Sequence, residues 1–198
     1  MPSRSDRPSP LALVLLVLLA EAPMHPYRMR ELLLERGKDR VANVAQRNSV
    51  YQTIERLDRV GLIRVRETAR DEGRPEKRVY ELTADGRTTL GEWLTSMLST
   101  PAREFPEFPA ALASVLVLGA AEVADALRRR ADTLERDLDE TRAVLDAVGL
   151  PRIVVLEEEY AQVVGRAEVA WLRQVVADFD SGELGWSEEL LRAMAAGH

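Results

Sequence analysis

Apolar residues recur in the first half of the chain in short runs that predict a series of helices. Ten consecutive apolar residues, Leu11–Ala20, predict a first helix that is buried on all sides. Because Pro26 suits the first turn of a helix and Gly37 suits a helix end, a second helix is predicted between them. Its expected core residues are Met29, Leu32 and Leu33.

A third helix is predicted to begin at a capping box. Ser49 and Gln52 have the S-x-x-Q spacing, in which the serine hydroxyl accepts a hydrogen bond from the backbone amide three residues later. Apolar positions then follow at helical spacing, and Gly61 is the expected helix end. The stripe consists of Val50, Ile54, Leu57 and Gly61.

Residues 63–66 and 78–82 alternate between apolar and polar side chains, which predicts a β-hairpin. The polar tip of this hairpin contains Gly73-Arg74-Pro75. A fourth helix is predicted to begin within Thr83–Gly86. Its apolar residues are Leu90, Trp93, Leu94 and Met97.

The order of these elements predicts the fold class. Three short helices and a two-stranded ribbon predict a winged helix-turn-helix domain over residues 11–98, after a Pro/Ser-rich and disordered stretch at 1–10. Prolines mark a linker over 99–109, and residues 110–198 are predicted to form a helical dimerisation domain. The predicted fold is therefore mainly α with a small β-wing, and its C-terminal domain is coiled-coil-like.

The C-terminal half is predicted to hold a short apolar helix over 110–118 and two long helices over 121–148 and 152–180, with a break at Gly149–Pro151. Apolar residues of the first long helix follow spacings of three and four, as in a coiled coil. They are Val123, Leu127, Ala131, Leu134, Leu138, Leu145 and Val148, together with Thr141. The second long helix carries Ile153, Leu156, Tyr160, Val163, Ala167 and Trp171.

Two helices joined by a tight break form an αα-hairpin, which cannot bury both apolar seams by itself. A second copy of the same chain is the simplest partner, so a homodimer is predicted. The residues expected at the dimer interface are Leu127, Leu134, Leu138, Leu145, Tyr160 and Trp171.

Charge is distributed unevenly along the chain. The net charge is −6, but residues 1–90 carry +4 and residues 91–198 carry −10. A basic front half suits contact with a polyanion, and an acidic back half keeps the molecule soluble. This asymmetry indicates that the two halves of the chain have different functions.

The residue inventory excludes several classes of chemistry. The chain has no cysteine and two histidines, His25 and His198, which excludes disulfides and thiolate zinc sites and leaves little for a histidine metal site. No paired carboxylates, phosphate-binding glycine loop or Ser/His/Asp arrangement stands out in the sequence. We therefore expect no enzyme activity, no metal and no cofactor.

The polar side of the third predicted helix is a candidate DNA-reading surface. If its apolar stripe faces the core, Gln52 and Arg59 point away from the core, with Tyr51 and Arg56 on the flanks. Arginine and glutamine can read base edges in the major groove, whereas an ordinary solvated helix face is the alternative. Amide groups at the N-terminus of the helix favour a phosphate, and the side chains there are Arg47, Asn48 and Ser49.

The hairpin tip adds a second group of cations. Arg70, Arg74, Lys77 and Arg78 lie within nine residues, and three acidic residues between them partly offset their charge. A basic tip beside a groove-reading helix suits contact with phosphates or with the minor groove. A solvated loop is the alternative interpretation of the tip alone.

Four segments resemble the PadR-type transcriptional regulators. Residues 22–27 (APMHPY) are similar to the junction of the first two helices in that family, although Pro26 stands where the family usually has glycine. Ser49-Val50-Tyr51 and Gly61-Leu62-Ile63 resemble the ends of its recognition helix. Residues 73–86 (GRPEKRVYELTADG) resemble its wing, and the acidic back half is similar to the C-terminal domain of its longer subfamily.

The resemblance implies a homodimeric, DNA-binding regulator, usually a repressor that a small molecule or other signal releases. It implies that Tyr27 and Tyr51 contact double-stranded DNA and that Arg74, Lys77 and Arg78 line the wing. A planar effector could stack on Trp93 or Trp171, although large aromatic residues are more often core or dimer contacts.

Two other functions are consistent with parts of the sequence. A winged helix can bind another protein without a role in DNA binding. Alternatively, Leu11–Ala20 resembles the apolar core of a signal peptide, which would make the protein a secreted helical one lacking residues 1–22. The run is too short to span a membrane, and we expect a cytoplasmic protein without membrane contact.

Overall fold

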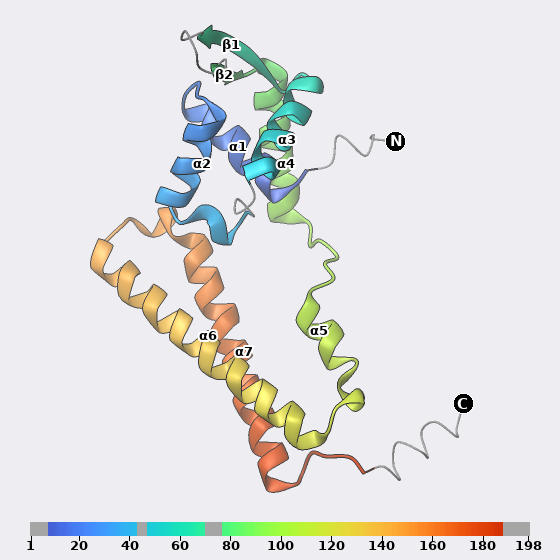
Figure 1. Cartoon of the computed structure of the whole chain (residues 1–198). Coiled ribbons are helices and arrows are strands. Elements are labelled where there is room, and N and C mark those ends of the chain that lie inside the picture. Colours follow the sequence, from blue (N-terminus) through green and yellow to red (C-terminus); the bar gives the residue numbers. More distant parts are fainter. Residues whose placement is uncertain (1–7, 43–46, 70–76, 188–198) are drawn as a thin grey trace. The chain divides into compact units, whose positions relative to one another are not determined.

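The computed structural model describes residues 8–42, 47–69 and 77–187 of the chain (Figure 1). The chain divides into two compact units, Met1–Arg103 and Glu104–His198, and each has its own hydrophobic core. The elements of the first unit are α1 (Pro10–Glu21), α2 (Pro26–Glu35), the 3-10 helix η2 (Lys38–Arg40), α3 (Arg47–Arg59), β1 (Ile63–Ala69), β2 (Lys77–Leu82) and α4 (Ala84–Ser99).

Helix α1 lies at the centre of the first core. It packs against α3, α4 and β2, and its five most buried side chains are at most 3% exposed. Burial therefore explains the apolar run at 11–20, and loss of residues 1–22 would take this helix out of the core. The buried residues that surround α1 are Met29 and Leu33 of α2, Val50, Ile54 and Leu57 of α3, Ile63, Tyr80, Leu90 and Trp93.

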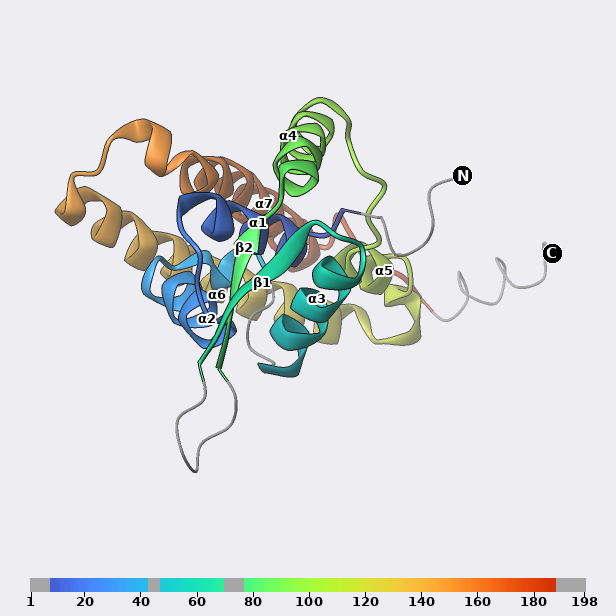
Figure 2. The same ribbon diagram turned by 90° about the horizontal axis from the view of Figure 1, so that it is seen from above.

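Strands β1 and β2 form the antiparallel hairpin that the alternating pattern predicted. Ile63 lies opposite Leu82 and Thr68 opposite Arg78, with an irregularity in the register between Val65 and Glu67. Figure 2 shows the ribbon extending away from the helices of its unit. The sequence-based prediction of a winged helix-turn-helix order is confirmed.

A short backbone bridge ties the ribbon to the junction between α1 and α2. The Met24 amide donates to the Tyr80 carbonyl at 3.0 Å, and the Tyr80 amide donates to the Met24 carbonyl at 3.1 Å. The Tyr80 side chain is 6% exposed, so this strand is anchored by both its backbone and its ring. A bridge between single residues leaves no alternating pattern in the sequence, so it was not predicted.

Thr83 connects three elements at the base of the ribbon. Its hydroxyl accepts a hydrogen bond from the Gly86 amide at 2.9 Å, which caps α4. The same hydroxyl lies 2.8 Å from the Gly61 carbonyl, to which it donates, just after the end of α3. The start of α4 and the end of α3 are therefore fixed to one another by one side chain.

The start of α3 differs from the prediction. The helix begins at Arg47, so Ser49 lies within its first turn and is not the cap that the S-x-x-Q spacing predicted. The Ser49 carbonyl accepts a hydrogen bond from the Thr53 hydroxyl at 2.7 Å, as an internal helical residue does. The capping-box prediction is therefore wrong, because the helix begins three residues before Val50, the first helical residue that a cap at Ser49 implies.

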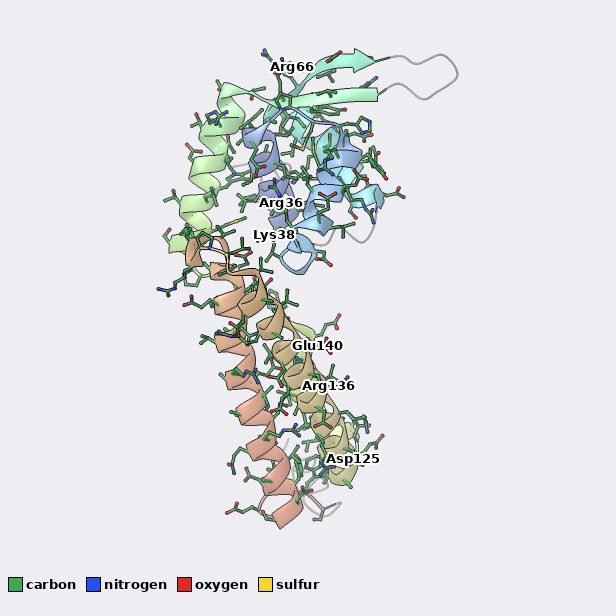
Figure 3. The ribbon with its side chains drawn as sticks, turned by 90° about the vertical axis from the view of Figure 1, so that its left-hand side faces the viewer. Arg36, Lys38, Arg66, Asp125, Arg136 and Glu140 are labelled. Carbon is green, nitrogen blue, oxygen red and sulfur yellow. The ribbon has the colours of Figure 1, made fainter. Side chains whose placement is uncertain are left out.

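The second unit is built on two long helices, α6 and α7. Its elements are α5 (Glu107–Leu112), the 3-10 helix η3 (Val115–Val117), α6 (Ala120–Val148), the 3-10 helix η4 (Arg152–Val154) and α7 (Leu156–Ser181). The two long helices pack against each other, as Figure 3 shows. The predicted αα-hairpin with a break at 149–151 is confirmed.

The predicted apolar helix over 110–118 is wrong. Helix α5 begins earlier, at Glu107, because Pro109 falls in its first turn, where no intrahelical amide is needed. It ends at Leu112, and the Ser114 hydroxyl donates to the Ala110 carbonyl at 3.1 Å instead of a continued helix. Gly119 is the cap residue of α6 and not the end of an earlier helix.

The coiled-coil-like seam of α6 faces α7 of the same chain. Val123, Leu127 and Ala131 of α6 are at most 5% exposed and pack with Leu172 and Val176 of α7. Leu134 packs at the edge of this cluster. Farther along, a Cβ on Gly165 would lie 2.8 Å from a methyl carbon of Leu138, so the glycine allows α7 to approach α6 closely.

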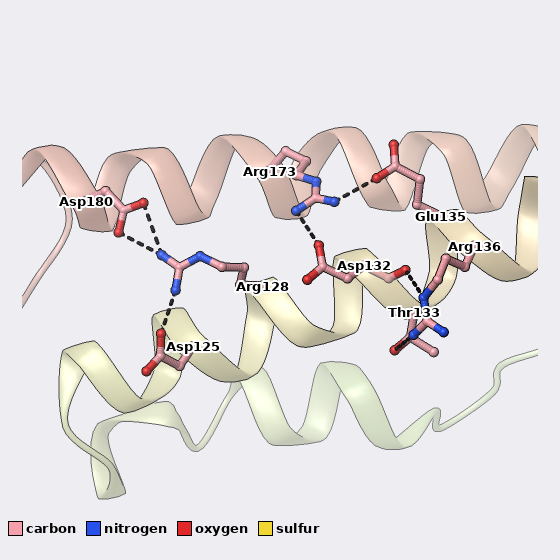
Figure 4. A network of polar contacts seen from close by, with 8 residues as sticks. All are labelled: Asp125, Arg128, Asp132, Thr133, Glu135, Arg136, Arg173 and Asp180. Atoms are coloured by element: carbon pink, nitrogen blue, oxygen red, sulfur yellow. Dashed lines mark hydrogen bonds and ion pairs between the residues drawn. The ribbon is translucent and has the colours of Figure 1, made fainter.

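Ion pairs run along both edges of the hairpin, and Figure 4 shows one set of them. Arg173 of α7 contacts Asp132 at 2.8 Å and Glu135 at 2.7 Å, and Arg128 of α6 contacts Asp180 at 2.9 Å. Each joins α6 to α7 on the surface. Because these groups are exposed, they fix the alignment of the helices more than they add to stability.

The apolar face that the sequence predicted on α7 does not face α6. Tyr160 is 71% exposed, Val163 66% and Trp171 46%, whereas the residues that face α6 are Val169, Leu172 and Val176. Trp171 contacts the Phe108 ring edge-on, with centroids 6.3 Å apart, and Arg130 lies 3.8 Å from the centroid of the same ring. Helix α7 thus has two apolar faces, and one of them is uncovered in the single chain.

Within the residues that the structure describes, no helix combines the length and hydropathy required to cross a lipid bilayer.

Candidate nucleic-acid interface

The exposed face of α3 is the candidate DNA-reading surface. Val50, Ile54 and Leu57 are at most 1% exposed, which fixes the orientation of the helix toward the core. With about 100° between successive residues, the side chains opposite the core form one row, which we call the α3 row. The row consists of Asn48, Gln52, Glu55 and Arg59, all of them exposed.

Side chains of the α3 row have no partner within the described part of the chain. Asn48, Gln52, Glu55 and Arg59 form no side-chain hydrogen bond or ion pair there. Tyr51, 37% exposed on one flank of the row, is also without such a bond within the described residues. The polar groups of this face are therefore available for an external ligand.

Other arginines of the first unit are paired with carboxylates. Arg36 forms two hydrogen bonds to Glu21, at 2.7 and 2.8 Å, and this contact lowers the pKa of the Glu21 carboxyl below its ordinary value. Arg28 contacts Glu35 at 2.8 Å, which raises the pKa of the guanidinium. Carboxylates therefore neutralise Arg28 and Arg36, whereas Arg59 of the α3 row has no such partner among the described residues.

Arg56 and Ser49 occupy less open positions than the α3 row. The Arg56 guanidinium donates to the Ser9 hydroxyl at 3.3 Å, so this side chain reaches toward the capped start of α1. Ser49 is half-buried. Arg47 begins α3, and its side chain lies outside the described residues.

The wing carries cations along both strands. Arg78 of β2 is exposed, and Arg64 and Arg66 of β1 are 71% and 58% exposed in their side chains. Arg64 lies 2.7 Å from Glu81, and Arg66, labelled in Figure 3, lies 3.9 Å from the same carboxylate. Arg74 lies outside the described residues, and so does the side chain of Lys77.

The junction before α2 contains a helix cap next to Pro26. His25 caps α2, because its Nδ1 accepts a hydrogen bond from the Tyr27 amide at 3.1 Å. Pro26 is buried and occupies the first helical position, which a proline fits without strain. Tyr27 is 48% exposed, so its ring is accessible beside this cap.

The two tryptophans considered for an effector differ in access. Trp93 is 9% exposed and packs in the core of the first unit, which leaves its ring little free area for a ligand to stack on. Trp171 is 46% exposed beside Phe108 in the second unit. Among the described residues, no group of three or more possible metal ligands occurs.

Sequence reasoning missed two members of this surface. Glu55 lies in the α3 row, three residues after Gln52 and four before Arg59, and helical spacing alone was sufficient to find it. Arg66 was assigned to a strand but not to the interface. The alternation of polar Arg64 and Arg66 with apolar Ile63 and Val65 along β1 could have indicated its exposure.

Three helices, a capped fourth helix and an antiparallel ribbon define the first unit as a winged helix-turn-helix domain, with exposed polar side chains on α3 and exposed arginines on its wing strands. Residues 14–92 match the model of the transcriptional regulator PadR-like family. The winged helix-turn-helix part of the chain is thus similar to the transcriptional regulators of this family. No curated protein matches the sequence significantly.

Solved structures share the fold of most of the chain. Bacillus subtilis PadR in complex with operator DNA has a TM-score of 0.67 and 20% identity, over 85% of this chain and 98% of that one. The same protein in complex with p-coumaric acid gives 0.67 and 20%, over 87% and 99%. The Vibrio cholerae virulence activator AphA gives 0.61 and 20%, over 86% and 98%. The similarity extends beyond the winged helix into the C-terminal helices.

Proposed function

We propose that this protein is a homodimeric transcriptional repressor of the cytoplasm that binds a palindromic operator and is released by a small-molecule effector. In this proposal the α3 row enters the major groove, and the wing contacts the flanking phosphates. Residues 11–98 bind the DNA, residues 110–198 pair the two copies, and 99–109 link the two parts.

The observation that carries the proposal is the free α3 row. Gln52 and Arg59 project from the side of α3 opposite its buried stripe, and neither is engaged by another side chain in the described structure. Glutamine can read adenine, and arginine can read guanine, by paired hydrogen bonds. Tyr51, Asn48 and Ser49 lie where side chains commonly hold the DNA backbone.

The uncovered face of α7 supports the homodimer. Leu156, Tyr160, Val163, Ala167 and Trp171 lie along the side of α7 that points away from α6, and all five are exposed in the single chain. Exposed apolar patches of this kind mark protein interaction sites. Leu127, Leu134 and Leu138 are used inside the hairpin, and their contribution to a dimer, like that of Leu145, stays a prediction.

Two similar structures support the choice of ligands. Bacillus subtilis PadR was solved with operator DNA and, separately, with p-coumaric acid. In helix-turn-helix dimers the two reading helices enter major grooves about 34–36 Å apart. An effector that changes this spacing would release the DNA, and the exposed Trp171 beside Phe108 offers a ring on which a planar molecule can stack.

The test is binding to the DNA upstream of the protein's own gene. We expect a gel shift on that fragment, lost when Gln52 and Arg59 are both changed to alanine and retained in Arg87→Ala, which removes an exposed cation of α4. The affinity is expected to fall steeply with salt. Absence of binding by the wild type at low ionic strength would contradict the proposal and favour a protein-binding winged helix.

A further inference from the structure

A carboxylate lies in the middle of the α3 row, where a DNA-binding surface is expected to be basic or neutral. Glu55 is exposed and forms no hydrogen bond or ion pair with any described residue. Arg59 lies four residues later on the same face, at the spacing that favours a Glu–Arg pair, yet no such pair is formed. The charge of Glu55 is therefore not neutralised within the described part of the chain.

The position of Glu55 places it at the bases if α3 enters the groove. It lies three residues after Gln52, which is about 4.5 Å along the helix axis, so it faces roughly the next base pair. Beside DNA phosphates, an unpaired carboxylate loses its water and is repelled. Its presence is unfavourable unless the DNA supplies a hydrogen-bond donor.

Base chemistry limits which donors are available. In the major groove the donors are the amino groups of cytosine and adenine, whereas guanine and thymine present acceptors there. Adenine also presents the N7 acceptor beside its amino group, which repels the second carboxylate oxygen. Cytosine presents its N4 amino group without such a neighbour, so it is the best partner for a glutamate.

We infer that Glu55 is a specificity-determining residue that accepts a hydrogen bond from the N4 amino group of a cytosine in each half of the operator. The inference rests on the proposed function, because it requires α3 to lie in the major groove. Glu55 also rejects guanine and thymine at that position, because their acceptor atoms face the carboxylate. Glu55 thus lowers the affinity for DNA of any sequence and increases the difference in affinity between the operator and other sequences.

The test compares operator preferences of Glu55 variants. Sites are selected from random duplexes by the full-length wild type, Glu55→Gln and Glu55→Ala. Affinities are then measured on duplexes that differ at one base pair of each half-site. We expect the wild type to prefer cytosine at one position by about tenfold, Glu55→Ala to lose this preference, and Glu55→Gln to shift it toward adenine.

Glu92→Gln is the matched control, because it removes an equally exposed carboxylate on α4. It is expected to keep the wild-type preference. Affinity for duplexes of unrelated sequence is expected to rise in Glu55→Gln, because a negative charge near the phosphates is removed. Melting temperatures of all three variants are expected to match the wild type, which separates base reading from a folding defect.

Two results would overturn the inference. If Glu55→Gln and Glu55→Ala select the same sequences as the wild type, Glu55 does not read a base, although α3 still binds DNA. If the wild type selects no sequence at all, the proposed function fails and this inference fails with it. The two failures are distinguishable, because in the first the wild type still binds a defined site.

Discussion

Gly86 of α4 lies so close to Leu62 that a Cβ on the glycine would stand 2.0 Å from the Leu62 carbonyl oxygen. That oxygen is held in place, because it accepts a hydrogen bond from the Thr83 amide at 3.1 Å. The base of the wing therefore depends on a missing side chain at position 86, although the backbone of this glycine is ordinary helix.

Replacement of this glycine is expected to destabilise the winged helix. Gly86→Ala should lower the free energy of unfolding by about 3 kcal/mol, because the backbone must move apart to admit the methyl group. Gly91→Ala on the same helix is the control, since no atom lies within 4 Å of its Cβ position. It should raise stability by about 0.5–1 kcal/mol. Urea denaturation of both variants checks the pair, and equal stabilities would contradict the packing argument.

The Glu21–Arg36 contact predicts a dependence of stability on acid pH. The guanidinium lowers the pKa of Glu21 below its ordinary value of 4.5, so the folded state binds this proton less tightly than the unfolded chain. The stabilisation is present above pH 4.5 and is lost as the pH falls through the lowered pKa. Because both groups are largely exposed, Glu21→Gln should cost about 0.5 kcal/mol at pH 7.

This difference between wild type and Glu21→Gln should shrink as the pH falls from 4.5 through the lowered pKa of Glu21, because the wild-type carboxyl then also becomes neutral. Glu92→Gln, whose carboxylate is exposed on α4, serves as the comparison and should show no such trend. The measurement is the midpoint of urea unfolding between pH 3 and pH 7. A Glu21→Gln difference that stays constant over this range would show that the ion pair is not its cause.

The wing is expected to act through charge. Changing Arg74 and Lys77 together to alanine should lower affinity for every DNA sequence. It should also flatten the dependence of log affinity on log salt by about 0.9 for each phosphate that these side chains no longer neutralise. Gln52→Ala should instead change sequence preference with little effect on the salt slope. Fluorescence anisotropy titrations at several salt concentrations distinguish the two. An unchanged slope in the double variant would refute the wing assignment.

The outer face of α7 is expected to hold the dimer together. Val163→Glu should give a monomer that remains helical, because Val163 is 66% exposed and makes little contribution to its own chain. Leu172→Ala should instead unfold the second unit, since Leu172 is fully buried and its truncation costs about 2–5 kcal/mol. Light scattering and circular dichroism measure the two effects.

Ala143→Glu supplies the control for a new charge in this unit. Ala143 lies on the side of α6 that carries Arg129, Arg136 and Glu140, two of which are labelled in Figure 3. This side is polar, so the variant should stay dimeric. If Val163→Glu were also dimeric, the pairing surface would lie elsewhere on the molecule.

Elements with a regular spacing of apolar residues were predicted correctly from the sequence. The stripe of α3 and the alternation of the wing place apolar residues at fixed periods, and burial of one face follows from the period itself. The seam of α6 was also found, because Val123, Leu127 and Ala131 repeat at helical spacing. The residues of the α3 row could also be identified in this way, because they lie on the face of the helix opposite its apolar stripe.

Local chemistry was less decisive. Ser49 fits a capping box, yet α3 starts at Arg47, because a cap depends on where the preceding chain turns and not on the spacing alone. The 110–118 prediction failed because Ser114 and Gly119 can end or begin a helix equally well. Such residues offer alternative hydrogen bonds, and the surrounding structure selects among them.

By itself the sequence determined the order of elements and the polar face of α3, because both depend on side-chain period within one segment. Only the tertiary structure decided which of the two apolar faces of α7 packs against α6. It also decided that Gly165 lies against the Leu138 side chain and that Gly86 lies against the Leu62 carbonyl, where a larger residue would not fit. Those relationships join residues distant in the chain. Their outcome is set by close packing in three dimensions, which no periodicity along a single helix specifies.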